Sequence, residues 1–153
     1  MLGHAWLNYQ KPVCKNYMKF ANPLKGWRLV SARNMTMAEI NKLLNLLDTH
    51  FETVREGESY YQEAGDYDFH YRIILGSKNQ QLITLLTEGI YHLVRMYRVQ
   101  LGMAGPRVTT AYAEHKHIAQ AILNRDEELA EILMRRHITY SKNTIAKKLA
   151  SQS

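Results

Sequence analysis

Apolar residues recur at helical spacing through most of the chain after residue 35. In the first such segment they share one helix face, at Ile40, Leu43, Leu44, Leu47, Phe51 and Val54. Thr36 and Glu39 form a capping box before this face, because a hydroxyl and a carboxylate at this spacing satisfy backbone amides at a helix start. Gly57 is a suitable stop. The pattern therefore predicts a helix between Thr36 and Gly57.

The same spacing predicts two further helices in the middle of the chain. One covers residues 60–75 and ends at Gly76. Residues 77–79 then form a short turn, in which Asn79 is the N-cap of a long third helix. This third helix is predicted to continue to Gly102.

Two more helices are predicted in the last third of the chain. Pro106 suits the first turn of a fourth helix over about residues 108–123. Asp126 caps a fifth helix, which includes His137 and either continues or breaks near Ser141. No segment shows the alternating β-branched pattern of a strand, so the predicted fold class is all-α.

Residues 1–34 differ from the rest of the chain because they show no helical or alternating period. This leader contains six basic residues and no Asp or Glu: Lys11, Lys15, Lys19, Lys25, Arg28 and Arg33. The remaining residues carry 14 basic and 14 acidic side chains, so the net charge of +6 belongs to the leader. Since a DNA-binding face usually clusters basic residues on a folded element, we expect no direct DNA contact from this chain. Residues 35–153 are interpreted as the folded domain.

Composition further limits the class of protein. No run of about 18 apolar residues is present, so no membrane span is expected. The N-terminus lacks the basic and then apolar layout of a secretion signal. A single cysteine, Cys14, excludes an internal disulfide and fits a reducing compartment. We therefore expect a cytoplasmic protein.

The predicted fourth and fifth helices each carry a histidine within an apolar face. On the fourth helix this face comprises Val108, Ala111, Tyr112, His115, Ile118, Ala119 and Ile122. Glu114, Lys116 and Gln120 are predicted to point elsewhere. On the fifth helix the corresponding face comprises Ala130, Leu133, Met134, His137 and Ile138. Each of these helices thus directs one imidazole toward the core.

The predicted second helix directs both a carboxylate and an imidazole toward the core. Asp66 and His70 are four residues apart and lie near the apolar Ile73 and Ile74. An unpaired buried carboxylate costs several kcal/mol or takes up a proton. A divalent cation between four converging side chains would remove this cost, with these ligands: Asp66, His70, His115 and His137. Such ligands suit zinc, nickel, manganese or iron.

A structural role for the histidines remains open from spacing alone. A histidine on an apolar face is commonly a core residue whose ring bonds to a carbonyl or hydroxyl group. We interpret His50 in this way, whereas His92 and His117 lie beside the apolar faces.

Short motifs over about Met35 to Tyr140 resemble the FCD domain, the C-terminal effector-binding domain of FadR-type regulators in the GntR superfamily. In chain order they are Asp66-x-x-Phe69-His70, Gly76-Ser-Lys-Asn79, Glu114-His115-x-x-Ile118, Asn124-Arg-Asp126 and Met134-Arg-Arg-His137-Ile138. The resemblance implies an antiparallel bundle of six or seven helices. It also implies a metal held by an Asp and three His, with a small carboxylate effector completing its coordination. Carried over to this chain, the metal positions are Asp66, His70, His115 and His137.

The resemblance also implies partners. It predicts a homodimer that senses a small organic acid and leaves DNA contact to a winged-helix domain, whose pattern is missing from this sequence. Arg95 and Tyr112 are candidates to contact the effector. We expect no enzyme, because the inner faces offer no obvious further carboxylate as a general base. Two alternatives remain open: a metal-dependent hydrolase or oxygenase, and a helical interaction module with structural histidines.

The family's first helix is also missing, and a change of reading frame would account for this. Reading the codons of residues 16–28 one nucleotide earlier permits Leu-Tyr-Glu-Val-Arg-Glu-Pro-Leu-Glu-Gly-Leu-Ala, the pattern of that helix. The shifted frame forces Leu at Tyr17 and Glu at Lys19. We therefore expect residues 1 to about 34 to be an out-of-frame translation, with the winged helix encoded upstream.

Overall fold

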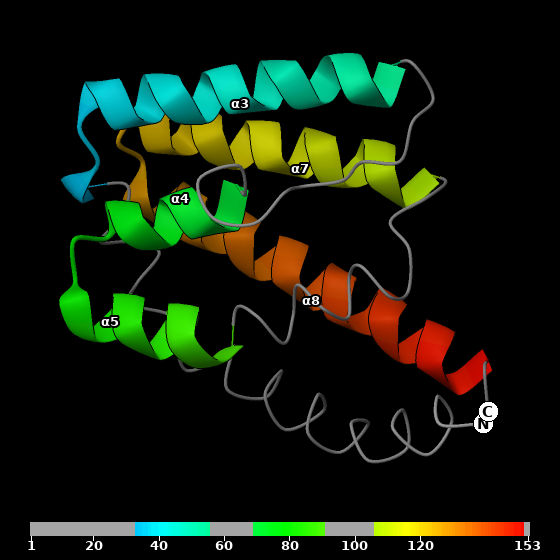
Figure 1. Cartoon of the computed structure of the whole chain (residues 1–153). Helices are drawn as coiled ribbons and strands as arrows, with labels where there is room; N and C mark the ends of the chain where they lie inside the picture. The colour runs from blue at the N-terminus through cyan, green and yellow to red at the C-terminus, as the bar shows by residue number, and fades with distance from the viewer. Residues whose placement is uncertain (1–32, 56–68, 91–105, 152–153) are drawn as a thin grey trace.

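The computed structural model describes residues 33–55, 69–90 and 106–151, and nearly all of these residues are helical (Figure 1). The helices are α3 (Met37–Arg55), α4 (Phe69–Gly76), α5 (Gln80–Leu85), the π-helical segment η2 (Leu86–Ile90), α7 (Pro106–Leu123) and α8 (Glu127–Ser151). No strand occurs within these ranges, which confirms the all-α class. α7 packs against both α3 and α8, and it runs in the opposite direction to α3 (Figure 1).

Helix α3 begins at the predicted capping box. The Glu39 N–H donates to Thr36 Oγ1 at 3.2 Å, and the Thr36 N–H donates to Glu39 Oε2 at 2.8 Å. Lys78, in the turn after α4, forms an ion pair with Glu39. Burial raises the pKa of the Glu39 carboxyl, but hydrogen bonds from Lys78 and Thr36 outweigh it and lower the pKa from its usual value of 4.5. The cap therefore also ties α3 to the α4–α5 turn.

Helix α4 ends at Gly76, as predicted. A Cβ atom at this position would overlap the side chain of Met35, so a glycine is required for close packing. The Asn79 side chain accepts a hydrogen bond from the Leu82 N–H at 3.2 Å, which confirms Asn79 as the N-cap of α5. The predicted start of the second helix, near Tyr60, lies outside the described residues.

The predicted third helix changes its hydrogen-bond pattern after Leu85, where α5 gives way to η2. Thr87 Oγ1 donates to the carbonyl of Ile83 at 2.7 Å and so competes with the backbone for this acceptor. Gly89 lies in the same segment and is a poor helix former. Both residues weaken the α-helical pattern at this point, whereas apolar spacing predicts an uninterrupted helix. The predicted end at Gly102 lies outside the described residues.

Helices α7 and α8 follow the predicted boundaries closely. α7 begins at Pro106, and Asp126 Oδ1 accepts a hydrogen bond from the Leu129 N–H at 2.9 Å at the start of α8. Of the two alternatives for the fifth helix, the continuous one is correct, because α8 passes Ser141 and extends to Ser151. None of the described helices has the length and apolar character needed to cross a bilayer.

Arg125, between α7 and α8, connects this turn to the start of α3. Its backbone adopts a left-handed conformation with φ 59°, which costs a non-glycine residue roughly 1–2 kcal/mol. Its guanidinium donates to the Met35 carbonyl at 2.6 Å. The neighbouring residue Asn34 donates to the carbonyl of Ser77, in the turn between α4 and α5, at 2.9 Å. The start of α3 and both turns therefore meet at one corner of the bundle.

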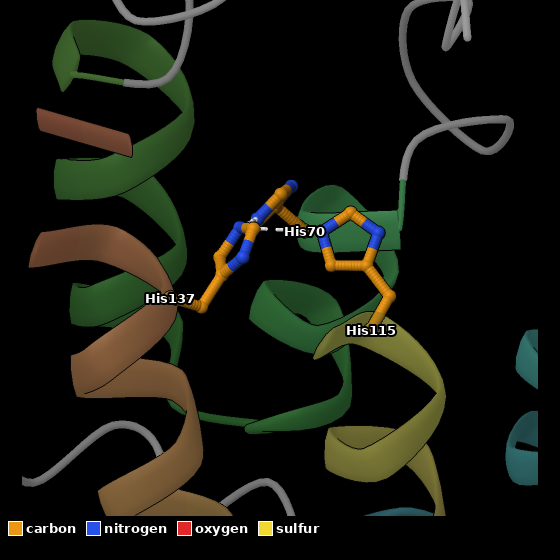
Figure 2. Close-up of side chains that lie close together, drawn as sticks. All are labelled: His70, His115 and His137. Atoms are coloured by element: carbon orange, nitrogen blue, oxygen red, sulfur yellow. Dashed lines mark hydrogen bonds between the residues drawn. The ribbon is translucent and has the colours of Figure 1, made fainter. Parts of the chain in front are cut away.

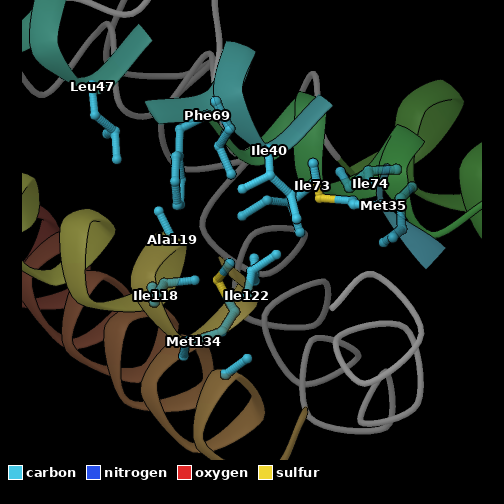
Figure 3. Close-up of a cluster of buried hydrophobic side chains, with 14 residues drawn as sticks. Met35, Ile40, Leu47, Phe69, Ile73, Ile74, Ile118, Ala119, Ile122 and Met134 are labelled. Atoms are coloured by element: carbon cyan, nitrogen blue, oxygen red, sulfur yellow. The ribbon is translucent and has the colours of Figure 1, made fainter. Parts of the chain in front are cut away.

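One apolar cluster fills the space between the helices (Figure 3). Its members are Met35, Ile40, Leu43, Leu47, Phe69, Ile73, Ile74, Leu86, Ile118, Ala119, Ala121, Ile122, Ala130 and Met134. The inner faces predicted for the fourth and fifth helices are therefore confirmed for the side chains that the structure describes, which do not include that of Val108. Phe51 departs from the prediction, because it is 43% exposed.

Candidate metal centre

Three histidines from three helices meet inside the bundle (Figure 2). His70 lies at the start of α4, His115 in the middle of α7 and His137 in the first half of α8. Nε2 of His137 lies 3.0 Å from Nε2 of His70 and 3.2 Å from Nε2 of His115. One ring nitrogen of each histidine lies within 4.8 Å of the others. The structure thus brings together three of the four side chains predicted to bind metal.

Apolar neighbours explain why these polar rings are buried. His115 is 1% exposed and His137 is 4% exposed, whereas His70 is half-buried. Ile118, one turn after His115 on α7, belongs to the apolar cluster. Met134, one turn before His137 on α8, belongs to it as well. Burial of the apolar faces therefore carries the imidazoles into the interior.

The ring of Phe69 supports the histidines from α4. Its centroid lies 4.2 Å from that of His115, with an angle of 16° between the ring planes, so the two rings are stacked. Phe69 also meets His70 edge-on, with the centroids 5.5 Å apart. Because Phe69 is fully buried, this stack shields one face of the His115 imidazole from solvent.

The two Nε2 separations to His137 suit a single metal ion. Zinc–nitrogen bonds of about 2.0–2.1 Å put two ligands of a tetrahedral ion about 3.3 Å apart. The separations of 3.0 and 3.2 Å around His137 are close to this value. The same separations also suit hydrogen bonds between the rings. The cluster therefore has the atoms to hold a metal ion.

Glu114 reaches the histidine cluster, contrary to the prediction that it points away from the core. Its Oε2 atom lies 2.6 Å from Nδ1 of His137, and its side chain is 27% exposed. Helical projection gives the direction of the Cα–Cβ bond but not the reach of a long side chain, and three torsions let this carboxylate extend from α7 to α8. The signal available in the sequence was a carboxylate directly before a predicted ligand, in Glu114-His115.

The other candidate residues are placed as follows. Asp66, Arg95 and His92 lie outside the described residues. His50, interpreted as a core histidine, is buried on α3 at 8% exposure. His117 is exposed on α7, beside the apolar face as expected.

Tyr112 lies on α7, one turn before His115, and is half-buried. Its ring centroid lies 5.4 Å from that of Phe51 on α3. Burial raises the pKa of the Tyr112 hydroxyl, and the negative charges of Asp48 and Glu52 raise it further. The hydroxyl therefore stays protonated at neutral pH and is available as a hydrogen-bond donor.

These observations define a class of protein, an all-α bundle with a buried histidine cluster contributed by three helices. The family model of the FCD domain matches residues 28–140, about three quarters of the chain, so the chain belongs to the FCD domain family. FCD domains are the regulatory, effector-binding domains of GntR-type regulators. The match begins slightly before Met35, the start of the resemblance described above. No curated protein matches the chain significantly.

Proposed function

We propose that this chain is a metal-dependent sensor of small carboxylates and the dimerising half of a GntR-type transcription regulator. The convergence of three Nε2 atoms inside an FCD domain carries the proposal. A divalent ion held there supplies a Lewis-acidic positive charge that attracts a carboxylate oxygen. The burial of His115 and His137 supports this role, because an ion in a dry site interacts more strongly with an anionic ligand.

Asp66 is the proposed fourth ligand. It precedes His70 by four residues, so the two share a face of any helix that includes both. One carboxylate and three neutral imidazoles suit zinc, nickel, manganese or iron. This set leaves coordination positions for water or for an effector carboxylate.

The proposed effector is a small organic acid that contacts the metal and the protein together. Tyr112 is a suitable donor, since its hydroxyl is protonated and lies on α7, one turn before His115. Arg95 is the proposed counter-charge for the acid.

Effector binding is coupled to helix arrangement because α4, α7 and α8 each supply one histidine. An acid that completes the site in one arrangement shifts the population toward it. In the proposed homodimer this shift changes the spacing of the DNA-binding domains, so effector and DNA affinities are linked reciprocally. The chain itself makes no DNA contact in this mechanism.

We assign the site to sensing and not to catalysis. The Glu114 carboxylate, beside the cluster, is directed at Nδ1 of His137, across the ring from the nitrogen that faces the other histidines. It is therefore engaged away from the point where a general base would act. Sustained turnover of small esters or phosphates by the purified protein would contradict this assignment. We also propose a cytoplasmic location, in keeping with the single Cys14.

The leader is proposed to be an out-of-frame translation. Met35 is buried in the apolar cluster and Asn34 bonds to the α4–α5 turn, so both residues fit the domain as translated. Because the family match begins at residue 28, we put the change of frame near that residue and not near residue 34. Sequencing the locus tests this idea, and an upstream frame without a helix-turn-helix pattern would contradict it.

Metal content and thermal stability test the proposed function together. We expect wild type to contain about one divalent ion per chain and to gain stability from the correct organic acid, by about 2.7 kcal/mol at 100 times its Kd. His115→Ala is expected to lose the metal and the acid-induced stabilisation together. His117→Ala, an exposed histidine on the same helix, is the matched control and is expected to keep both. A wild type without metal, or a His115→Ala variant with undiminished metal, would contradict the proposal.

A further inference from the structure

The two ring nitrogens of His137 face different partners. Nε2 lies 3.0 Å from Nε2 of His70 and 3.2 Å from Nε2 of His115. Nδ1 lies 2.6 Å from Glu114 Oε2, on the opposite side of the ring. An ionised carboxylate accepts hydrogen bonds and donates none. The contact therefore puts the single hydrogen of a neutral imidazole on Nδ1 and directs the Nε2 lone pair at the other two rings.

This arrangement affects metal binding because a histidine ligates through a nitrogen that carries no hydrogen. An imidazole without a fixed acceptor at Nδ1 divides its population between two tautomers, and the one with hydrogen on Nε2 cannot bind at that atom. Since His137 is 4% exposed, bulk water gives little help in moving the hydrogen or turning the ring. Outer partners of this kind typically change metal affinity by 10–100-fold.

We propose that Glu114 is a positioning residue, which holds His137 in the Nδ1–H tautomer with Nε2 directed at the metal position. The inference rests on the proposed metal site and adds a residue to it. Glu114 directly precedes His115, so α7 supplies one ligand and also orients the ligand from α8. A movement of α7 relative to α8 therefore changes both the position of His115 and the Glu114–His137 contact. Metal and effector binding are thus sensitive to how these two helices pack.

Zinc affinity of substituted full-length chains tests the proposal. Competition with a chromophoric chelator near pH 8 is expected to show 10–100-fold weaker binding for Glu114→Ala. Glu114→Gln is expected to bind with intermediate affinity, because its carbonyl can accept the Nδ1–H but carries no charge. Glu131→Gln is the control, since this carboxylate on α8 pairs with Arg135 at 3.9 Å and not with a histidine. Thermal melts of the metal-free variants establish that each one folds.

The tautomer gives a readout that a purely structural role would not change. In the metal-free wild type, two-bond 1H–15N spectra of His137 are expected to show hydrogen on Nδ1 and an unprotonated Nε2. In Glu114→Ala the signals are expected to move toward the other tautomer. Equal zinc affinity in wild type and Glu114→Ala, or a wild type with hydrogen on Nε2, would overturn this inference alone. A wild type that takes up no zinc would overturn the proposed function and this inference with it.

Discussion

Two adjacent regions of the bundle, the apolar cluster and the histidine cluster, share helices α4, α7 and α8 but depend on different interactions. On α7, His115 and Ile118 are one turn apart, and each is 1% exposed. Burial of an Ile118-sized side chain stabilises the fold by about 1.5–3 kcal/mol. Burial of an imidazole is favourable only when its polar atoms find partners. The apolar cluster thus stabilises the fold by burial alone, whereas the histidine cluster also depends on contacts between its polar atoms.

This difference supports the proposal that the histidine cluster binds a metal ion. Replacing a buried polar pair by apolar groups of the same shape is often close to neutral for stability. Three converging imidazoles, two of them buried, would be stabilised by a cation bound between their ring nitrogens. Substitutions in the apolar cluster are therefore expected to lower the stability of the fold, and substitutions in the histidine cluster to weaken metal binding.

The largest loss of stability is expected from Ile40→Ala in the apolar cluster. Ile40 is fully buried on α3, a helix that contributes no residue to the histidine cluster. The substitution is expected to lower the free energy of unfolding by about 2–5 kcal/mol. Urea unfolding with a chelator present measures this loss. The folded variant is expected to keep its metal, and loss of metal at low urea would break the distinction between the two regions.

Gly76→Ala is expected to cost about 1–3 kcal/mol, because its Cβ would overlap the buried Met35 side chain. A double-mutant cycle with Met35→Ala isolates the energy of this overlap, because Met35→Ala removes the side-chain atoms that the new Cβ would meet. The double variant is expected to lose less stability than the sum of the single variants. Strict additivity would show that the overlap is relieved in some other way.

His115→Leu tests whether the histidine cluster contributes to metal binding and not to folding. Leucine fills a similar volume, so the metal-free variant is expected to unfold within about 1.5 kcal/mol of wild type. The substitution removes one proposed ligand and the ring that stacks on Phe69. Chemical unfolding with and without zinc is expected to show that added zinc stabilises wild type only. A metal-free variant destabilised as strongly as Ile40→Ala would make His115 a structural residue.

The smallest expected effect is the pH dependence of the α3 cap, which lies outside both regions. The pKa of Glu39 is lowered in the folded protein, so its contribution is present above about pH 4.5 and is lost as pH falls through the lower folded pKa. Glu39→Gln lacks this titration. The difference in melting temperature between wild type and Glu39→Gln is therefore expected to shrink on acidification, and a difference that grows would contradict the assignment.

Local signals were sufficient for most helix boundaries. Thr36, Asn79 and Asp126 each bond to a backbone amide three residues ahead, and such contacts depend on nearby sequence alone. The Arg125–Met35 bond joins residues 90 positions apart, so it depends on how the helices pack. The exposure of Phe51 and the π-helical turn η2 were missed for related reasons, because apolar spacing reports neither the positions of neighbouring helices nor side-chain bonds to the backbone.

The candidate site was predictable to the extent that helix direction decides it. Apolar periodicity and the family motifs both selected His70, His115 and His137, which the structure brings together. Glu114 was missed because its contact is made by the end of a flexible side chain on a neighbouring helix. The spacing of residues along one helix gives the direction of ligands, whereas the groups that orient them depend on packing between helices.

X-ray absorption spectroscopy of the zinc-loaded protein tests the central claim most directly. The account predicts nitrogen and oxygen ligands at about 2.0–2.1 Å, with the outer-shell scattering of three imidazoles in wild type, whereas His115→Leu is expected to lose the ion and to show no imidazole-bound zinc after excess metal is removed. A spectrum with sulfur ligands, or with the same number of imidazoles in both proteins, would contradict it.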